Sequence, residues 1–242
     1  MTLNSLVRSV AGVGKTRNDD AFLDAPEYGL FAVADGVGAS ADPYRSSRLA
    51  VETLQKEFGR PRTPLANSNS GSHLRDCVRA ANLALYESGK RIHRPMLSTL
   101  TAIWIQPHSL CLAHCGDSRA YLSENLATRL LTHDHTVVGE LVRRGFLSES
   151  DAESHPQRSM LSACLGQHEQ ARIDVFQTAI TDAAFRLLLC SDGVSGYLPD
   201  ARIAELLARN DAPDISVADL IAAALEGGST DDLTAILVCG AG

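Results

Sequence analysis

Acidic residues stand at the ends of the most apolar segments of this 242-residue sequence. The five apolar residues 30–34 indicate a strand buried on both faces, which ends at Asp35 and is followed by glycines. The same arrangement returns where residues 187–190 lead to Asp192. Burying several like charges together is costly, so either these groups face solvent separately or divalent cations neutralise them. Further carboxylates at strand edges are Asp19, Asp20, Asp117, Asp231 and Asp232.

Carboxylate and backbone carbonyl oxygens are hard ligands, which suit magnesium or manganese better than zinc. Two such ions about 3.5 to 4 Å apart can share a water, lower its pKa and aim it at a phosphoryl group. A single Asp-Gly pair is an ordinary turn former, and that explanation is adequate for any one of these sites. Their repeated placement beside apolar strands favours one shared metal centre.

Two other motifs give weaker signals. Residues 12–16 resemble a phosphate-binding loop, but Ser9 stands where that loop needs a glycine, and the following Arg-Asn-Asp-Asp is a poor start for a helix. His133-Asp134-His135 could begin a zinc site, yet no further ligands follow at close spacing. We interpret this motif as a polar turn that caps a helix beginning at Val137.

Composition limits the function classes. The net charge of −7 and the lack of a basic run argue against a nucleic-acid partner. Residues 1–13 lack the apolar core of a signal peptide, and no apolar run reaches the roughly 18 to 20 residues that span a bilayer. A cytoplasmic protein with no membrane partner is expected. The length and the hydrophobic content of 45% predict one domain over residues 1–242, and the six scattered cysteines predict buried, reduced thiols.

Apolar periodicity predicts an α+β fold with helix pairs outside paired antiparallel sheets. Residues 60–72 are expected to form an exposed loop, and the polar stretch 144–166 a flap over a site. The first three strands are expected to form an antiparallel meander. Strands are predicted at 3–11, 21–24, 30–34, 98–106, 109–115, 119–123, 171–178, 185–191 and 233–239, and helices at 42–58, 73–92, 137–144, 200–209 and 216–226.

Motifs spread over nearly the whole chain resemble those of the metal-dependent serine/threonine protein phosphatases of the type 2C family, in its compact bacterial form. Seven or more motifs in the family's order make the resemblance specific. They include Asn18-Asp19-Asp20-Ala21, Phe31-Ala-Val-Ala-Asp35-Gly36-Val-Gly38, Ser98-Thr99-Leu100-Thr101, Cys115-Gly116-Asp117-Ser118-Arg119, Leu131-Thr-His-Asp134-His135, Leu165-Gly166, Ser191-Asp192-Gly193 and Ser229-Thr-Asp231-Asp232.

The resemblance implies a four-layer α-β-β-α sandwich with two central antiparallel sheets and a cleft at one end. It also implies hydrolysis of phosphoserine and phosphothreonine by a metal-bridging hydroxide. Two Mn²⁺ or Mg²⁺ ions would be bridged by Asp35, with the Gly36 carbonyl as a further ligand. Asp19 would serve one ion, Asp192 and Asp231 the other, Asp20 would orient metal-bound water, and Asp117 with Asp192 would hold a weaker third ion.

This sequence departs from the family pattern near the metal site. Asp19 replaces the usual glutamate, and Asp232 replaces a common asparagine. Lys15 stands where the family has the arginine that grips the phosphate, and lysine lacks the bidentate fork of arginine. We favour Lys15 as the phosphate contact, with Arg17 as the alternative. Val37 replaces a histidine that has been proposed as general acid in eukaryotic relatives, so protonation of the leaving group would fall to metal-bound water or to another group.

The expected partners are phosphorylated proteins and a cognate serine/threonine kinase whose action the chain, as a monomer, would reverse. Two alternatives remain open at this point. One is a pseudophosphatase that binds a phosphorylated partner without cleaving it, which the Lys15 and Asp232 substitutions favour and the retained metal aspartates oppose. The other is a phosphatase dedicated to an anti-anti-sigma-type regulator.

Overall fold

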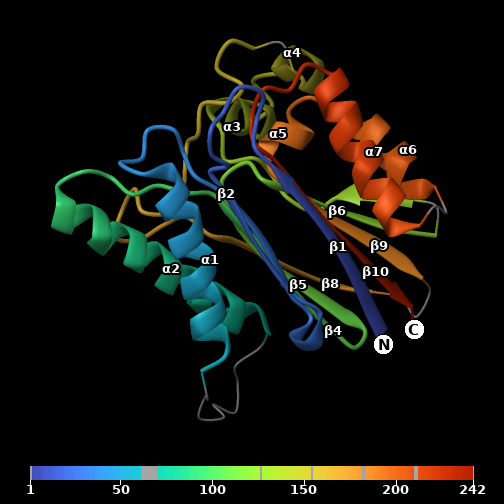
Figure 1. Cartoon of the computed structure of the whole chain (residues 1–242), viewed down its shortest axis with the longest axis horizontal. Helices are drawn as coiled ribbons and strands as arrows, with labels where there is room; N and C mark the ends of the chain where they lie inside the picture. The colour runs from blue at the N-terminus through green and yellow to red at the C-terminus, as the bar shows by residue number, and fades with distance from the viewer. Residues whose placement is uncertain are drawn as a thin grey trace.

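The structure, a computed structural model, describes residues 2–60, 70–125, 127–153, 155–180, 184–209 and 212–241. Two five-stranded antiparallel sheets pack face to face, with helices on their outer sides (Figure 1). Sheet I has the order β1 (Thr2–Val10), β10 (Leu233–Ala241), β9 (Phe185–Cys190), β6 (Arg119–Glu124), β7 (Ala127–Leu130). Sheet II has the order β2 (Asp20–Ala25), β3 (Leu30–Asp35), β4 (Leu100–Gln106), β5 (Ser109–Cys115), β8 (Asp174–Ala179).

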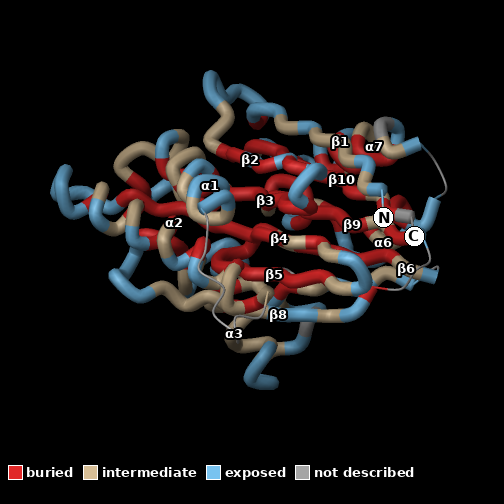
Figure 2. The backbone as a smooth tube through the Cα atoms, turned by 90° about the horizontal axis from the view of Figure 1, so that it is seen from below, coloured by how far each residue is buried: buried red, intermediate tan, exposed pale blue. Residues whose placement is uncertain are grey.

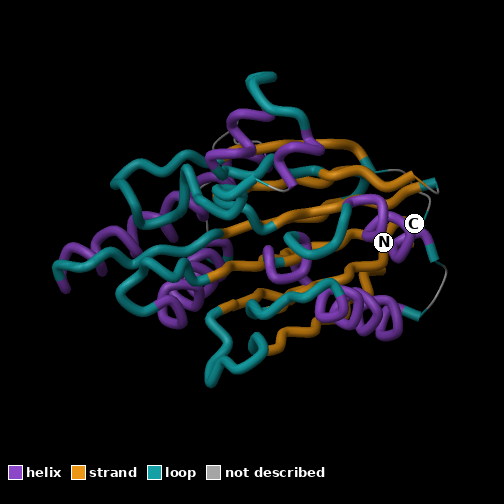
Figure 3. Tube along the Cα trace, turned by 90° about the horizontal axis from the view of Figure 1, so that it is seen from above, coloured by secondary structure: helices purple, strands orange, loops and turns teal. Residues whose placement is uncertain are grey.

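Four helices form the outer layers, and Figure 3 shows them on either side of the strands. The helices α1 (Pro43–Phe58) and α2 (Ser70–Ile92) cover sheet II, whereas α6 (Asp200–Ala208) and α7 (Pro213–Glu226) cover sheet I. The four-layer α-β-β-α sandwich and the α+β class are therefore confirmed.

Three apolar clusters fill the spaces between the four layers, and the strands are the most buried part of the chain (Figure 2). Strand β3 contributes to two of them because successive side chains point to opposite faces. Phe31 and Val33 pack between the sheets, while Leu30, Ala32 and Ala34 pack toward α1 and α2. The expected burial of this strand on both faces is confirmed.

Helix α1 begins as the sequence predicts. The Asp42 side chain accepts a hydrogen bond from the backbone N–H of Arg45 at 3.3 Å, and Pro43 occupies the first helical position. Helix α2 begins earlier than expected, at Ser70, so residues 70–72 are helical and not loop; residues 61–69 of that predicted loop lie outside the described residues.

The predicted meander is wrong for its first strand. β1 pairs along its whole length with β10, at the far end of the sequence, while β2 and β3 pair with each other in the other sheet. Strand β7 and the four-residue helix α5 (Asp192–Ser195) were not predicted from the sequence.

The short helices α3 (Val137–Arg143), α4 (Glu149–Glu153) and α5 gather at one end of the sandwich, uppermost in Figure 1. A 3-10 turn, η1 (Pro26–Tyr28), connects β2 to β3. No helix in the described ranges combines the length and the apolar character that crossing a bilayer requires.

Candidate metal centre

The predicted acidic sites meet at the end of the sandwich beside α5. Asp20 opens β2 and Asp35 closes β3, and the antiparallel register places these two residues opposite each other. From sheet I, Asp192 begins α5 directly after β9, and Asp231 lies just before β10. Because β9 and β10 are neighbours, Asp192 and Asp231 lie at the same end of sheet I, close enough to Asp35 of sheet II for their charges to raise its pKa.

Two glycines permit this close approach of loops. A Cβ on Gly36 would collide with the carbonyl of Pro43 at the start of α1. A Cβ on Gly193 would collide with the carbonyl of Asp232, which brings the start of α5 against the turn that carries Asp231. The Asp-Gly pairs are therefore turn formers, and they also allow the carboxylates beside them to converge.

The carboxylates raise one another's pKa. Burial raises the pKa of Asp35 well above its ordinary range, and the charges of Asp20, Asp192, Asp117 and Asp231 raise it further. The pKa of Asp117 is raised in the same way, by burial and then by the charge of Asp192. Burial is also the main cause of the raised pKa values of Asp20 and Asp192. Asp20, Asp35, Asp117, Asp192 and Asp231 thus form one electrostatic group, in which mutual repulsion adds to the cost of burial.

Unpartnered oxygens show where a cation would be accepted. Within the described residues, Asp20 Oδ1 and Asp192 Oδ1 are buried and have no hydrogen-bond partner, although the Ser191 hydroxyl donates to Asp20 Oδ2 at 2.7 Å. In the same part of the chain, no group of three or more His, Cys, Asp or Glu side chains is spaced so that it could hold a metal ion. The donors that converge here are oxygens only, so their chemistry fits magnesium or manganese.

Asp19 and Arg17 lie at the edge of this group. Arg17 Nε donates to Asp19 Oδ1 at 3.0 Å, and its Nη2 donates to Asp42 Oδ1 at 3.2 Å. The guanidinium also stands 4.7 Å from the centre of the Tyr44 ring. Both residues are in place beside the carboxylates, with Arg17 about half exposed.

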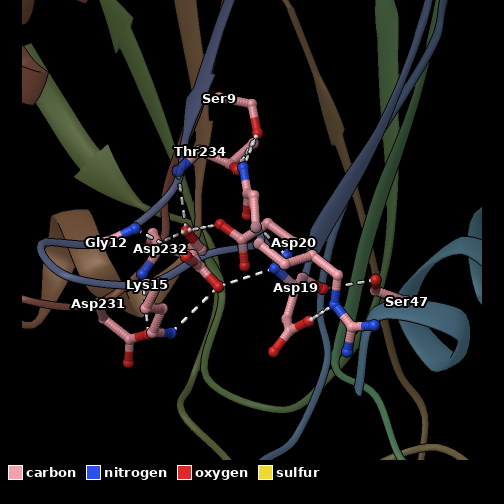
Figure 4. Close-up of polar contacts among 12 residues, drawn as sticks. Ser9, Gly12, Lys15, Asp19, Asp20, Ser47, Asp231, Asp232 and Thr234 are labelled. Atoms are coloured by element: carbon pink, nitrogen blue, oxygen red, sulfur yellow. Dashed lines mark hydrogen bonds and ion pairs between the residues drawn. The ribbon is translucent and has the colours of Figure 1, made fainter. Parts of the chain in front are cut away.

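Lys15 reaches two carboxylates of the β10 turn (Figure 4). Its ammonium donates to Asp231 Oδ1, and to Asp232 Oδ2 at 3.1 Å. Partial burial acts to lower the pKa of Lys15, but these hydrogen bonds outweigh it and raise the pKa above its ordinary range. The lysine in the arginine position and the aspartate in the asparagine position are thus bonded to each other.

Asp232 is a structural centre that sequence reasoning missed. Its side chain is 2% exposed, and it accepts backbone N–H groups from Gly12 and Asp19, each at 2.8 Å. It therefore ties both ends of the 12–19 loop to β10 (Figure 4). The sequence signal was the Asp231-Asp232 pair, which we interpreted only as added negative charge.

Asn18 is a second residue whose role was missed. Its side-chain oxygen accepts the backbone N–H of Asp20 at 2.9 Å, and its amide donates to the Ser9 hydroxyl at 2.8 Å. An asparagine two residues before an aspartate is a recognisable turn signal. Here the turn fixes the entry of Asp20 into β2.

The interpretation of His133-Asp134-His135 as a helix cap is wrong. Thr136, next to the first helical residue, accepts the Gly139 N–H at 2.9 Å and caps α3 instead. Asp134 binds Arg119, with distances of 2.9 Å to Nε and 2.7 Å to Nη2. The backbone N–H of His135 donates to the Gly116 carbonyl at 2.7 Å, which holds the turn that carries Asp117.

Comparison with known proteins agrees with this geometry. A sequence model of the family described as Protein phosphatase 2C matches residues 11–237. The serine/threonine phosphatase stp of Listeria monocytogenes is 30% identical over 227 residues, which cover 91% of this chain and 88% of that protein. The serine/threonine protein phosphatase PstP of Mycobacterium tuberculosis is 33% identical over 240 residues, which are 98% of this chain and 45% of that longer protein.

Solved structures give the same result. The crystal structure of the Mycobacterium tuberculosis phosphatase PstP/Ppp superposes with a TM-score of 0.89 at 31% identity, covering 100% of both chains. The PstP catalytic domain in complex with two manganese ions superposes with a TM-score of 0.83 at 30% identity, covering 98% of this chain and 97% of that one.

The chain belongs to the protein phosphatase 2C family. It is a serine/threonine phosphatase of the metal-dependent type.

Proposed function

We propose that this chain removes phosphate from phosphoserine and phosphothreonine in proteins, using two Mn²⁺ or Mg²⁺ ions at the Asp35 end of the sandwich. The observation that carries this proposal is the convergence of carboxylates from both sheets, where burial and the charges of neighbouring carboxylates raise the pKa values of Asp35 and Asp117. In the proposed ligand set, Asp35 would be shared by both ions and the Gly36 carbonyl would contribute an oxygen. Asp19 would hold one ion, and Asp192 with Asp231 would hold the other.

When bound, the ions supply Lewis-acid stabilisation of charge and a lowered pKa of water. The chain's own residues fix the geometry around them. Asp20 is held by the Ser191 hydroxyl and by the Asn18 turn, so its free oxygen is positioned to orient the attacking water. A buried, oriented carboxylate of raised pKa is suited to exchanging a proton with that water.

Lys15 and Arg17 are the proposed phosphate-binding cations. The Lys15 ammonium donates to Asp231, a proposed metal ligand, and this contact supports a role beside the charge that would develop on the phosphoryl group. Arg17 offers a guanidinium beside Asp19 and is stacked near Tyr44. We propose Lys15 as the first contact and Arg17 as the second.

A third, weaker ion is proposed at Asp117 together with Asp192. The support is electrostatic: Asp117 is 7% exposed, and the neighbouring Asp192 charge raises its pKa. A cation between these two carboxylates would remove that repulsion.

The finer biological assignments are also proposals. We propose that residues 1–242 act as one catalytic unit, as a monomer in the cytoplasm, on targets of a serine/threonine kinase. The net charge of −7 supports protein partners over nucleic acid. A phosphorylated anti-anti-sigma-type regulator belongs to the same substrate chemistry. The full carboxylate set and relatives named as phosphatases do not favour a pseudophosphatase.

The proposal is tested by hydrolysis of a small aryl phosphate and of a phosphothreonine peptide. Each is measured with Mn²⁺, with Mg²⁺ and with a chelator. Manganese-dependent turnover of both substrates is expected. If the folded protein hydrolyses neither substrate with any divalent ion, the proposal is contradicted and a pseudophosphatase becomes the better explanation.

A further inference from the structure

A groove outside the metal centre lies between α3 and the segment 162–172. It has a volume of about 510 Å³. Its lining includes the side chains of Glu140, Arg143, Arg144, Gln167, Gln170 and Arg172. We call it the arginine groove.

Glu140 organises the arginines of this groove. Arg172 Nη1 and Arg143 Nη2 donate to its two oxygens, the latter at 2.6 Å, and Arg144 Nε lies 3.9 Å away. Hydrogen bonds from Arg143 and Arg172 lower the pKa of Glu140 to about 2. Glu140 therefore stays ionised near neutral pH and acts as an anchor for the guanidinium groups.

Positive charge remains after these pairings. Arg172 also contacts Asp174 at 3.4 Å, so three guanidinium groups share two carboxylates. The surplus faces solvent, because the side chains of Arg143 and Arg144 are 51% and 64% exposed. In a chain with 22 basic and 29 acidic residues, such a local excess of positive charge runs against the overall balance.

The wall of the groove is connected to the metal centre. Cys164 lines the groove, and the next residue, Leu165, exchanges two backbone hydrogen bonds with Ser98, at 2.8 and 3.3 Å. The Ser98 hydroxyl in turn donates to the Asp35 carbonyl at 2.9 Å. Two hydrogen-bonded steps thus join the groove wall to the proposed bridging residue.

We infer that the arginine groove binds an acidic segment of the phosphoprotein substrate, next to the phosphorylated residue in sequence. This inference rests on the proposed function. Guanidinium groups recognise carboxylates and phosphates through charge-assisted, often bidentate hydrogen bonds. The neutral Gln167 and Gln170 side chains add hydrogen-bonding groups for the peptide backbone.

The test compares two phosphothreonine peptides that differ only in the residues flanking the phosphothreonine, which are Glu in the acidic peptide and Gln in the neutral one. The comparison is made once with these residues on the N-terminal side of the phosphothreonine and once with them on the C-terminal side. With Mn²⁺ at low salt, kcat/KM for the acidic peptide is expected to be about five- to tenfold higher, through KM. The preference should fall as ionic strength rises, because exposed charges are screened. Arg144→Glu should bring the ratio of the two peptides close to one.

Arg202→Glu is the matched control. This substitution makes the same charge change on the exposed face of α6, away from the groove, and should keep the wild-type ratio. Aryl phosphate turnover of each preparation reports the metal centre separately. If that turnover is absent, the proposed function fails, and the groove is tested by fluorescence titration of the two labelled peptides. Equal affinity or equal kcat/KM for both peptides, or a preference unchanged in Arg144→Glu, would overturn the inference.

Discussion

The metal centre and the arginine groove both contain carboxylates, but the negative charge of these carboxylates is compensated in different ways. At the metal centre, Asp20, Asp35 and Asp192 face one another, and their pKa values rise. In the arginine groove, Glu140 is surrounded by guanidinium groups, and its pKa falls to about 2. The groove compensates its acidic charge with the protein's own cations, whereas within the described residues no Lys or Arg side chain pairs with Asp20, Asp35 or Asp192.

This difference separates structural from functional use of the same residue type. A carboxylate paired within the chain stabilises the fold around it, while an unpaired buried one destabilises the fold until a cation binds. Lys15 is an intermediate case, because its single ammonium is shared between Asp232 and Asp231, at the edge of the metal centre.

The largest effect is expected at the metal centre. Asp192→Asn removes a proposed ligand, so turnover of an aryl phosphate with Mn²⁺ should fall roughly a thousandfold, which corresponds to the several kcal/mol that a metal supplies. In chelator, the same variant should be at least as stable as the wild type, because one of several like charges is gone. Turnover and urea unfolding measure the two effects. If the variant keeps wild-type turnover, or unfolds more easily in chelator, the carboxylates of the metal centre are not uncompensated charges that await a cation, and the contrast with the arginine groove fails.

Manganese binding should stabilise the wild type. At free Mn²⁺ of about 100 times Kd, linkage adds about 2.7 kcal/mol to the free energy of unfolding. Thermal unfolding with Mn²⁺ and with sodium chloride at equal ionic strength separates specific binding from screening. Asp192→Asn should show a much smaller Mn²⁺ effect. An equal stabilisation by sodium chloride would mean that screening alone relieves the centre.

How far the sequence predicts each region follows from the range of the interactions. The convergence of the carboxylates was predictable because each of them follows or precedes its own apolar strand, and the pattern is local. The pairing of β1 with β10 was not, since Val10 opposite Leu233 is a contact between chain ends. The start of α2 at Ser70 was missed because Ser and Gly favour turns, and tertiary packing overrides that preference.

The arginine groove could not be predicted from the sequence either, because its contacts join residues that are far apart in the chain. Arg172 reaches Glu140 across 32 residues, and no periodicity connects them. Lys15 and Asp232 were each recognised as departures from the family pattern, but their 3.1 Å contact depends on the fold. The residues were identifiable one at a time, and their pairing was not.

The Lys15 and Asp232 pair allows a finer test of charge compensation. In a double-mutant cycle of Lys15→Met and Asp232→Asn, urea unfolding in chelator should show a coupling of about 1 kcal/mol, kept small because the Lys15 side chain is 36% exposed. Either single variant already removes the Lys15–Asp232 contact, so the double variant should cost less than the sum of both. Strict additivity would show that the two substitutions are independent of each other.

The smallest effect is expected in the arginine groove. Glu140→Gln keeps the shape but weakens the hydrogen bonds from Arg143 and Arg172, so the free energy of unfolding at pH 7 should fall by about 0.5 kcal/mol. The pKa of Glu140 is about 2 in the folded protein, against an ordinary 4.5, so the unfolded chain binds the extra proton first as pH falls.

The stabilising contribution of Glu140 is therefore complete above about pH 4.5 and declines toward pH 2, so wild type and variant should converge over that interval. Urea unfolding between pH 7 and pH 3 measures this convergence. Glu205→Gln is the control, because Arg202 also donates to Glu205 at 2.6 Å but the pair is exposed on α6, where little change is expected. If both variants lose the same stability at every pH, the enclosure of Glu140 by three arginines contributes nothing beyond an ordinary surface ion pair. The arginine groove would then lose its contrast with the metal centre.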